Sequence, residues 1–103
     1  MKIIEKLSEK ISEEIRDAKE YATMALEHRE DYPDLSSTLY DISREEMNHM
    51  SRLHSAVTEV IQQYRKEKGE PPASMLAVYD YLHKQQIEKA ADVKTLQAMF
   101  NEK

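Results

Sequence analysis

Three ionisable residues, Glu14, Glu46 and His49, stand at positions of the sequence where the surrounding pattern would place apolar residues. Glu46 and His49 are three residues apart, so on a helix both project from one face towards a common point. A Glu-x-x-His pair on a helix offers an oxygen and a nitrogen ligand to one transition-metal ion. A carboxylate among apolar residues is costly unless it is paired, protonated or bound to a metal. The three residues therefore indicate a carboxylate–histidine metal half-site.

Two long helices would have to position these residues. Steps of three and four residues, which keep side chains on one helix face, connect two sets: Leu7, Ile11, Glu14, Ala18, Tyr21 and Ala25, and Leu35, Leu39, Ile42, Glu46, His49, Leu53, Ala56 and Val60. This spacing predicts helices over residues 3–29 and 35–66. The turn between them contains Pro33, and the side-chain oxygens of Asp34 to Ser36 are expected to cap the second helix.

A third helix is expected after the Gly69–Pro72 segment, where glycine suits a helix stop and the prolines prevent continuation. It is predicted over residues 74–100, with Ser74 as its cap. Its apolar residues form two stripes, Leu76, Tyr79 and Leu82, and Ile87, Ala91, Leu96 and Phe100. A kink or break near residues 90–92 is therefore expected. The predicted organisation is one domain, with a hairpin over 1–68, a linker over 69–73 and a C-terminal helix over 74–103.

The fold class expected from these elements is all-α. The first two helices are about 40 Å and 45 Å long at 1.5 Å per residue, and a short turn should fold them into an antiparallel hairpin. In that hairpin Glu14, Glu46 and His49 fall within about one and a half turns of one level. A hairpin alone leaves its apolar stripes partly uncovered, so a third helix, a second copy of the chain or both must cover them.

Composition excludes several classes of function. The 103 residues contain no cysteine, which removes disulfides, cysteine-ligated zinc, iron–sulfur clusters and thiol nucleophiles. Fifteen Lys and Arg are mixed with 20 Asp and Glu, and no basic stripe supports nucleic-acid binding. No apolar run is long enough to span a membrane, and the first ten residues resemble a helix and not a signal peptide. We therefore expect a cytoplasmic protein.

The two motifs resemble those of a known superfamily. The segment 11–25, with Glu14, Ala18 and Tyr21, resembles the first helix of ferritin-like and rubrerythrin-like domains, and the segment 43–49 resembles their second helix. The resemblance covers residues 10 to 60, about half of the chain. Family members bind two irons between four helices, using two lone glutamates and two Glu-x-x-His pairs. This chain has one of each, and its third helix does not match the family.

The resemblance implies a ferritin-like half-bundle that dimerises. A symmetric dimer would supply Glu14, Glu46 and His49 twice and complete a four-helix bundle, an arrangement similar to that of encapsulated ferritins, although no encapsulin-targeting tail is recognised. The implied cofactor is iron, or else manganese or another divalent metal. Glu46 would bridge or chelate the metals, Glu14 would be a terminal carboxylate and His49 a terminal nitrogen ligand. The implied activity is oxidation of Fe(II) by oxygen or peroxide, of the ferroxidase type.

A hypothesis from a different class stays open beside this one. The chain could be a non-catalytic helical assembly or adaptor protein, for example a phage-encoded or accessory factor, in which Glu14, Glu46 and His49 form a buried cluster that fixes the helix register. The remaining histidines are interpreted without metal: His28 complements the dipole at the end of the first helix, and His54 is structural or solvated. The methionines are interpreted as core residues and not as copper ligands.

Overall fold

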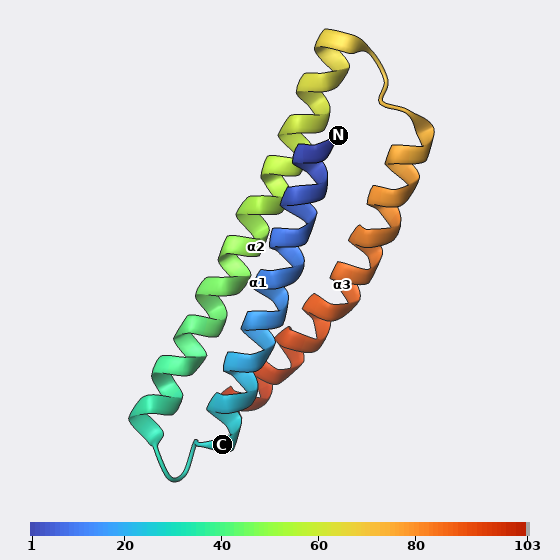
Figure 1. Ribbon diagram of the computed structural model, residues 1–103. Coiled ribbons are helices and arrows are strands. Elements are labelled where there is room, and N and C mark those ends of the chain that lie inside the picture. The colour runs from blue at the N-terminus through green and yellow to red at the C-terminus, as the bar shows by residue number, and fades with distance from the viewer. Residues whose placement is uncertain (103) are drawn as a thin grey trace.

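Three helices make up the protein in a computed structural model that describes residues 1–102 (Figure 1). They are α1 (Lys2–Glu27), α2 (Pro33–Lys68) and α3 (Ala73–Asn101), and no strand occurs among the described residues. The molecule is elongated, 56 × 18 × 18 Å. Helices α1 and α2 form a hairpin, and α3 packs mainly on α1 and touches α2 much less. The predicted all-α class is confirmed. Of the helices described, none is both long and apolar enough to cross a membrane.

The helix ends differ from the expected capping pattern. Helix α2 begins at Pro33, whose fixed φ suits a first helical position, and no side chain caps it. The hydroxyl of Ser36 instead donates a hydrogen bond to the carbonyl oxygen of Ala25 in α1. Helix α3 likewise starts after Pro72 without a side-chain cap, so the expected role of Ser74 is also wrong. The serine near the start of α2 therefore joins two helices and does not cap one.

The link between α2 and α3 depends on a single glycine. Gly69 has φ = 83°, a backbone conformation that other residues rarely adopt, and its N–H donates to the carbonyl oxygen of Arg65 at 3.1 Å. No atom lies within 4 Å of the place where a Cβ would be built, so the backbone angle and not a lack of space requires glycine. This stop ends α2 and turns the chain back towards α1 (Figure 1).

The buried face of α1 is rotated by about one residue from the predicted seam. Its buried residues again follow steps of four and three: Ile4, Ser8, Ile11, Ile15, Ala18, Ala22 and Ala25. Glu14 and Tyr21, expected at the centre of the seam, are only half buried. The reason is that α1 packs against two helices, so its most buried face points between α2 and α3. Of the predicted seam, Ile11, Ala18 and Ala25 are buried, whereas Leu7, Glu14 and Tyr21 lie at the edge of the core.

The buried face of α2 shows the same rotation, with Ser36, Leu39, Ser43, Met47, Val57 and Ile61 as its buried residues. Glu46 is half buried and His49 exposed. The alanines of α1 opposite this face are fully buried, and their small side chains allow the two backbones to approach closely. The glutamate and the histidine of the Glu-x-x-His pair therefore border the core without lying inside it.

Helix α3 is continuous from Ala73 to Asn101, so it is not broken near residues 90–92. Its packing does not follow the two expected apolar stripes. The residues that face the other helices form one seam, and all are buried or half buried: Met75, Tyr79, Leu82, Gln86, Ala90, Val93, Gln97 and Phe100. Because Gln86 and Gln97 in this seam are polar, a pattern of regularly spaced apolar residues does not reveal it. The amide of Gln86 donates to the backbone oxygen of Ser8 and to the hydroxyl of Ser12, both at 3.1 Å. Ile87, expected in a stripe, is 54% exposed.

Replacing Ser43 by alanine should lower the free energy of unfolding by about 1 kcal/mol. The fully buried Ser43 hydroxyl donates to the Ala18 carbonyl oxygen at 2.7 Å and accepts a hydrogen bond from the Gln97 amide at 2.9 Å. Urea denaturation of the metal-free protein measures the change. The matched control is Ser51→Ala, an exposed serine of the same helix, which should alter stability by less than about 0.5 kcal/mol. An equal loss in both variants would contradict the role of Ser43.

Candidate metal centre

Glu14, Glu46 and His49 lie together in the folded chain. One ligand atom from each residue can be chosen so that all three lie within 4.8 Å of one another. The Nδ1 atom of His49 lies 3.6 Å from the Oε2 atom of Glu14. That distance is too long for a hydrogen bond and suits two groups facing a common centre. Spacing and helix length in the sequence were enough to select these residues.

Two serine hydrogen bonds set the register that brings the residues together. The Ser36 hydroxyl donates to the Ala25 carbonyl, and the Ser43 hydroxyl donates to the Ala18 carbonyl. Both bonds fit one antiparallel pairing, because seven residues forward along α2 correspond to seven residues back along α1. Continuing that pairing places Glu14 opposite the segment between Glu46 and His49. The level of the cluster is therefore fixed by contacts outside it.

The carboxylate of Glu14 is the most constrained part of the cluster. Its side chain is 23% exposed, whereas that of His49 is 50% exposed. The Glu14 Oε2 atom itself is buried, and no described residue gives it a hydrogen bond. A buried carboxylate oxygen without a partner is unfavourable, and a divalent cation would remove the penalty. Two carboxylates and one imidazole fit such an ion.

The cluster opens onto the side of the hairpin that α3 does not cover. Contacts of α2 with α3 include those of Tyr40, Ser43 and His54, which lie on a different face of the helix from Glu46 and His49. A shallow groove at the cluster is lined by Glu14, His49, Arg52 and Leu53. No described residue of α3 joins the three ligands, so Glu88 and His83 of that helix do not complete the site. The cluster of possible ligands in one chain therefore has an open side.

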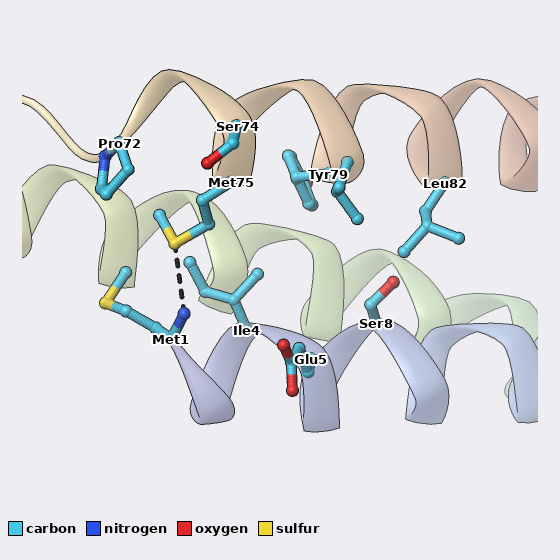
Figure 2. Close-up of a pocket in the computed structure, with 10 residues that line it drawn as sticks. Met1, Ile4, Glu5, Ser8, Pro72, Ser74, Met75, Tyr79 and Leu82 are labelled. Atoms are coloured by element: carbon cyan, nitrogen blue, oxygen red, sulfur yellow. Dashed lines mark hydrogen bonds between the residues drawn. The ribbon is translucent and has the colours of Figure 1, made fainter.

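A pocket elsewhere on the molecule has a different character. Figure 2 shows it between the first turns of α1 and of α3, lined by apolar side chains that include Ile4, Tyr79 and Leu82. The ammonium group of Met1 donates to the sulfur of Met75 at 3.2 Å across this pocket. Glu5 is its only carboxylate, so the pocket holds no set of metal ligands. Its contacts attach the start of α3 to α1.

A pair of histidines lies between α2 and α3, and no sequence pattern indicated it. The rings of His54 and His83 have their centroids 4.4 Å apart, although the residues belong to different helices. Burial, and to a lesser degree the nearby His83, lowers the pKa of His54 below its usual value. His54 was interpreted as structural or solvated, and it is half buried. Only the packing of α3, which no local spacing encodes, could have shown the pair.

The lowered pKa of His54 predicts acid sensitivity. The folded state binds a proton at His54 less readily than the unfolded state does, so this contribution to stability is fully present above pH 6.5. It is lost as pH falls through the pKa of the folded state. In His54→Gln the free energy of unfolding, measured by urea denaturation between pH 7.5 and 5 without metal, should fall less than in the wild type. His28→Gln is the control, because it alters an exposed histidine that is paired with Asp31. Its free energy of unfolding should still show the decrease that His54 causes in the wild type. If the free energy of unfolding of His54→Gln fell with pH as steeply as that of the wild type, the prediction would be wrong.

Comparisons of the chain with protein family models, with curated proteins and with solved structures find no match. The resemblance to ferritin-like domains therefore stays an interpretation of the two helical motifs. The structure shows the fold and a cluster of possible ligands, and it assigns the chain to no family. The protein is a three-helix, all-α chain in which Glu14, Glu46 and His49 form a group that could hold a metal ion.

Proposed function

We propose that the protein binds a divalent transition-metal ion, iron or manganese, through Glu14, Glu46 and His49. The observation that carries the proposal is the buried Oε2 atom of Glu14, which has no hydrogen bond and belongs to a cluster with a glutamate and a histidine of the adjacent helix. Imidazole suits iron and carboxylates suit manganese, and mixed oxygen and nitrogen ligands are typical of non-haem Fe(II) sites. None of the three ligands requires a change of fold to approach one ion, because their donor atoms already lie within 4.8 Å.

The half-site is proposed to be completed by a second copy of the chain. Three protein ligands leave coordination positions open on an ion that prefers five or six ligands. The face that carries them is not covered by α3, and it includes the half-buried apolar residues Ile42, Leu53 and Val60 of α2. A two-fold axis is the commonest symmetry of small oligomers, and across it the same surface meets itself. Two hairpins joined in this way would form a four-helix bundle around two half-sites.

The activity that follows from such a site is oxidation of Fe(II). Iron would be the substrate as well as the bound metal, and each Fe(II) would give one electron to dioxygen or peroxide. In this proposal Glu46 chelates or bridges the two ions, Glu14 is a terminal carboxylate and His49 a terminal imidazole ligand. Arg52 and Leu53 at the groove would limit access to the open side. This step rests on the resemblance to di-iron carboxylate proteins in addition to the geometry.

The competing function is a helical assembly protein in which the cluster only fixes the register. The contact between Glu14 and His49 is the observation in its favour, since it forms without metal. The hydrogen bonds of Ser36 and Ser43 already fix the register, however, so the cluster is not needed for that purpose. This function predicts that the wild type binds no metal, while Glu46→Leu would stabilise the metal-free protein by about 1–3 kcal/mol.

The experiment that tests metal binding is elemental analysis of protein purified without a chelating tag. It is followed by anaerobic titration with Fe(II) and then by addition of oxygen, with absorbance in the ferric–oxo region as the readout. We expect about one ion per chain and a higher melting temperature with Fe(II) or Mn(II), because a ligand of the folded state stabilises it by mass action. Protein that holds no metal and gains no stability from either ion would refute the proposal.

A further inference from the structure

A pair of possible nitrogen ligands lies on a different face of α2 from Glu46 and His49. His54 of α2 and His83 of α3 have ring centroids 4.4 Å apart and ring planes inclined by 39°. The Nδ1 atom of His54 is buried and receives no hydrogen bond from any described residue. We propose that His54 and His83 form a separate binding site for a late first-row divalent ion, Cu²⁺ or Zn²⁺, that clamps α3 to α2.

The distance between the two rings fits one shared ion. A metal–nitrogen bond of about 2.0–2.1 Å puts an imidazole centroid roughly 3.2 Å from the ion that one of its nitrogens binds. Two centroids 4.4 Å apart would then meet at the ion at an angle close to a right angle. That angle is acceptable for square-planar or tetragonal Cu²⁺ and needs a small opening for tetrahedral Zn²⁺. Because the rings are tilted and not face to face, their edges can turn towards a common point.

The surroundings of the pair favour an ion that prefers nitrogen. The rings border a groove of about 560 Å³ between α2 and α3, which has room for an ion and its water ligands. No carboxylate lines this groove, so hard ions such as Mg²⁺, Ca²⁺ and Mn²⁺ have little to bind. Gln86, also in the groove, is already committed to Ser8 and Ser12. Besides the hydroxyls of Ser51 and Ser55 and the thioether of Met50, the imidazoles are the ligands that the groove offers, and they are the strongest of these for Cu²⁺ and Zn²⁺.

Both histidines are prepared for coordination. Burial, and to a lesser degree the nearby His83, lowers the pKa of His54, so protons compete less with a metal there. The ring of Tyr79 stacks on that of His83, with centroids 5.8 Å apart and planes within 13°, and holds its orientation. Lys94 lies at the rim of the groove and is the one cation that lines it, so an anion could accompany the metal.

A bound ion would strengthen the weakest contact between helices. Helix α3 packs mainly on α1 and touches α2 sparsely, so a bridge from His54 to His83 would add a link between α2 and α3. This inference does not depend on the proposed iron or manganese site, whose ligands lie on another face of α2. The two sites would also differ in selectivity, since one has two carboxylates and an imidazole and the other has two imidazoles.

Electron paramagnetic resonance of the protein with one equivalent of Cu²⁺ tests the inference. We expect hyperfine coupling to two nitrogens. Its dependence on His54 and His83 distinguishes this site from the Glu14–Glu46–His49 cluster, which would contribute two histidines only across a dimer. In His54→Gln and in His83→Gln the two-nitrogen signal should disappear, and Zn²⁺ affinity by calorimetry should fall roughly 100-fold, because the second ligand of a chelating pair acts at high effective concentration. The double variant should bind little worse than either single variant.

His28→Gln is the matched control, because it removes an exposed histidine that is paired with Asp31. It should keep both the two-nitrogen signal and the Zn²⁺ affinity. Circular dichroism verifies that each variant is folded, and if His54→Gln unfolds, His83→Gln carries the test. Coupling to a single nitrogen in the wild type, or Zn²⁺ affinity in His83→Gln within twofold of the wild type, would overturn the inference. Loss of iron binding in Glu46→Ala would not affect the inference about His54 and His83.

Discussion

Glu46→Ala should weaken Fe(II) or Mn(II) binding at least about 100-fold, whereas Glu45→Ala should leave the affinity almost unchanged. The two glutamates are adjacent, so about 100° of helix rotation separates their side chains. Glu46 is half buried and belongs to the cluster with Glu14 and His49, while Glu45 is exposed. The pair of variants removes the same charge from neighbouring positions, which makes Glu45→Ala a control for net charge and helix propensity.

Mn(II) affinity is best measured by the loss of the free-ion signal in electron paramagnetic resonance, with Fe(II) tested by anaerobic competition. Equal affinity in the wild type and in Glu46→Ala would remove Glu46 from the site and with it the main reason to assign a metal function. A Glu46→Leu variant that stabilises the metal-free protein, together with an absence of metal binding in the wild type, would favour the assembly function instead. Metal affinity, and not the stability of the metal-free variant, therefore distinguishes the two functions.

The helices and the cluster were predictable from the sequence because both depend on local spacing. Two long apolar repeats, a proline turn and one glycine–proline stop were enough to place α1, α2 and α3 within a few residues. Glu14, Glu46 and His49 were found because they interrupt those repeats. Their common level followed from helix rise alone, and the Ser43–Ala18 hydrogen bond now explains why the level holds.

Features that depend on how α3 packs could not be predicted. The buried face of α1 turned towards Ile15 and Ala22 because it serves two neighbours, which a pattern on one helix does not reveal. The seam of α3 was misread because Gln86 is buried through its hydrogen bonds to α1 and not through apolar character. The His54–His83 pair was missed because only the packing of α3 brings the two rings together. Polar residues that are satisfied across helices are invisible to an apolar repeat.

The largest change in assembly is expected from Ile42→Glu. Ile42 lies one helical turn before Glu46 on the face of α2 that α3 leaves open, and it is half buried in the single chain. If two hairpins pair through this face, each copy of the new carboxylate meets apolar residues or its own symmetry mate. Like charges brought together in an interface cost several kcal/mol, so the dimer should dissociate at least about 100-fold more readily.

Sedimentation equilibrium at micromolar concentrations measures this effect. The wild type should fit a mass twice the 12.1 kDa of the chain, and Ile42→Glu should move towards the monomer and lose metal affinity in parallel, because each half-site then lacks its counterpart. Ile87→Glu alters an isoleucine of α3 that is 54% exposed and lies away from the proposed interface, so it should remain dimeric. A wild type that stays at 12.1 kDa over a wide concentration range would refute the shared di-iron site. Binding of one ion per monomer, abolished by Glu46→Ala, would then be the function that the three ligands support.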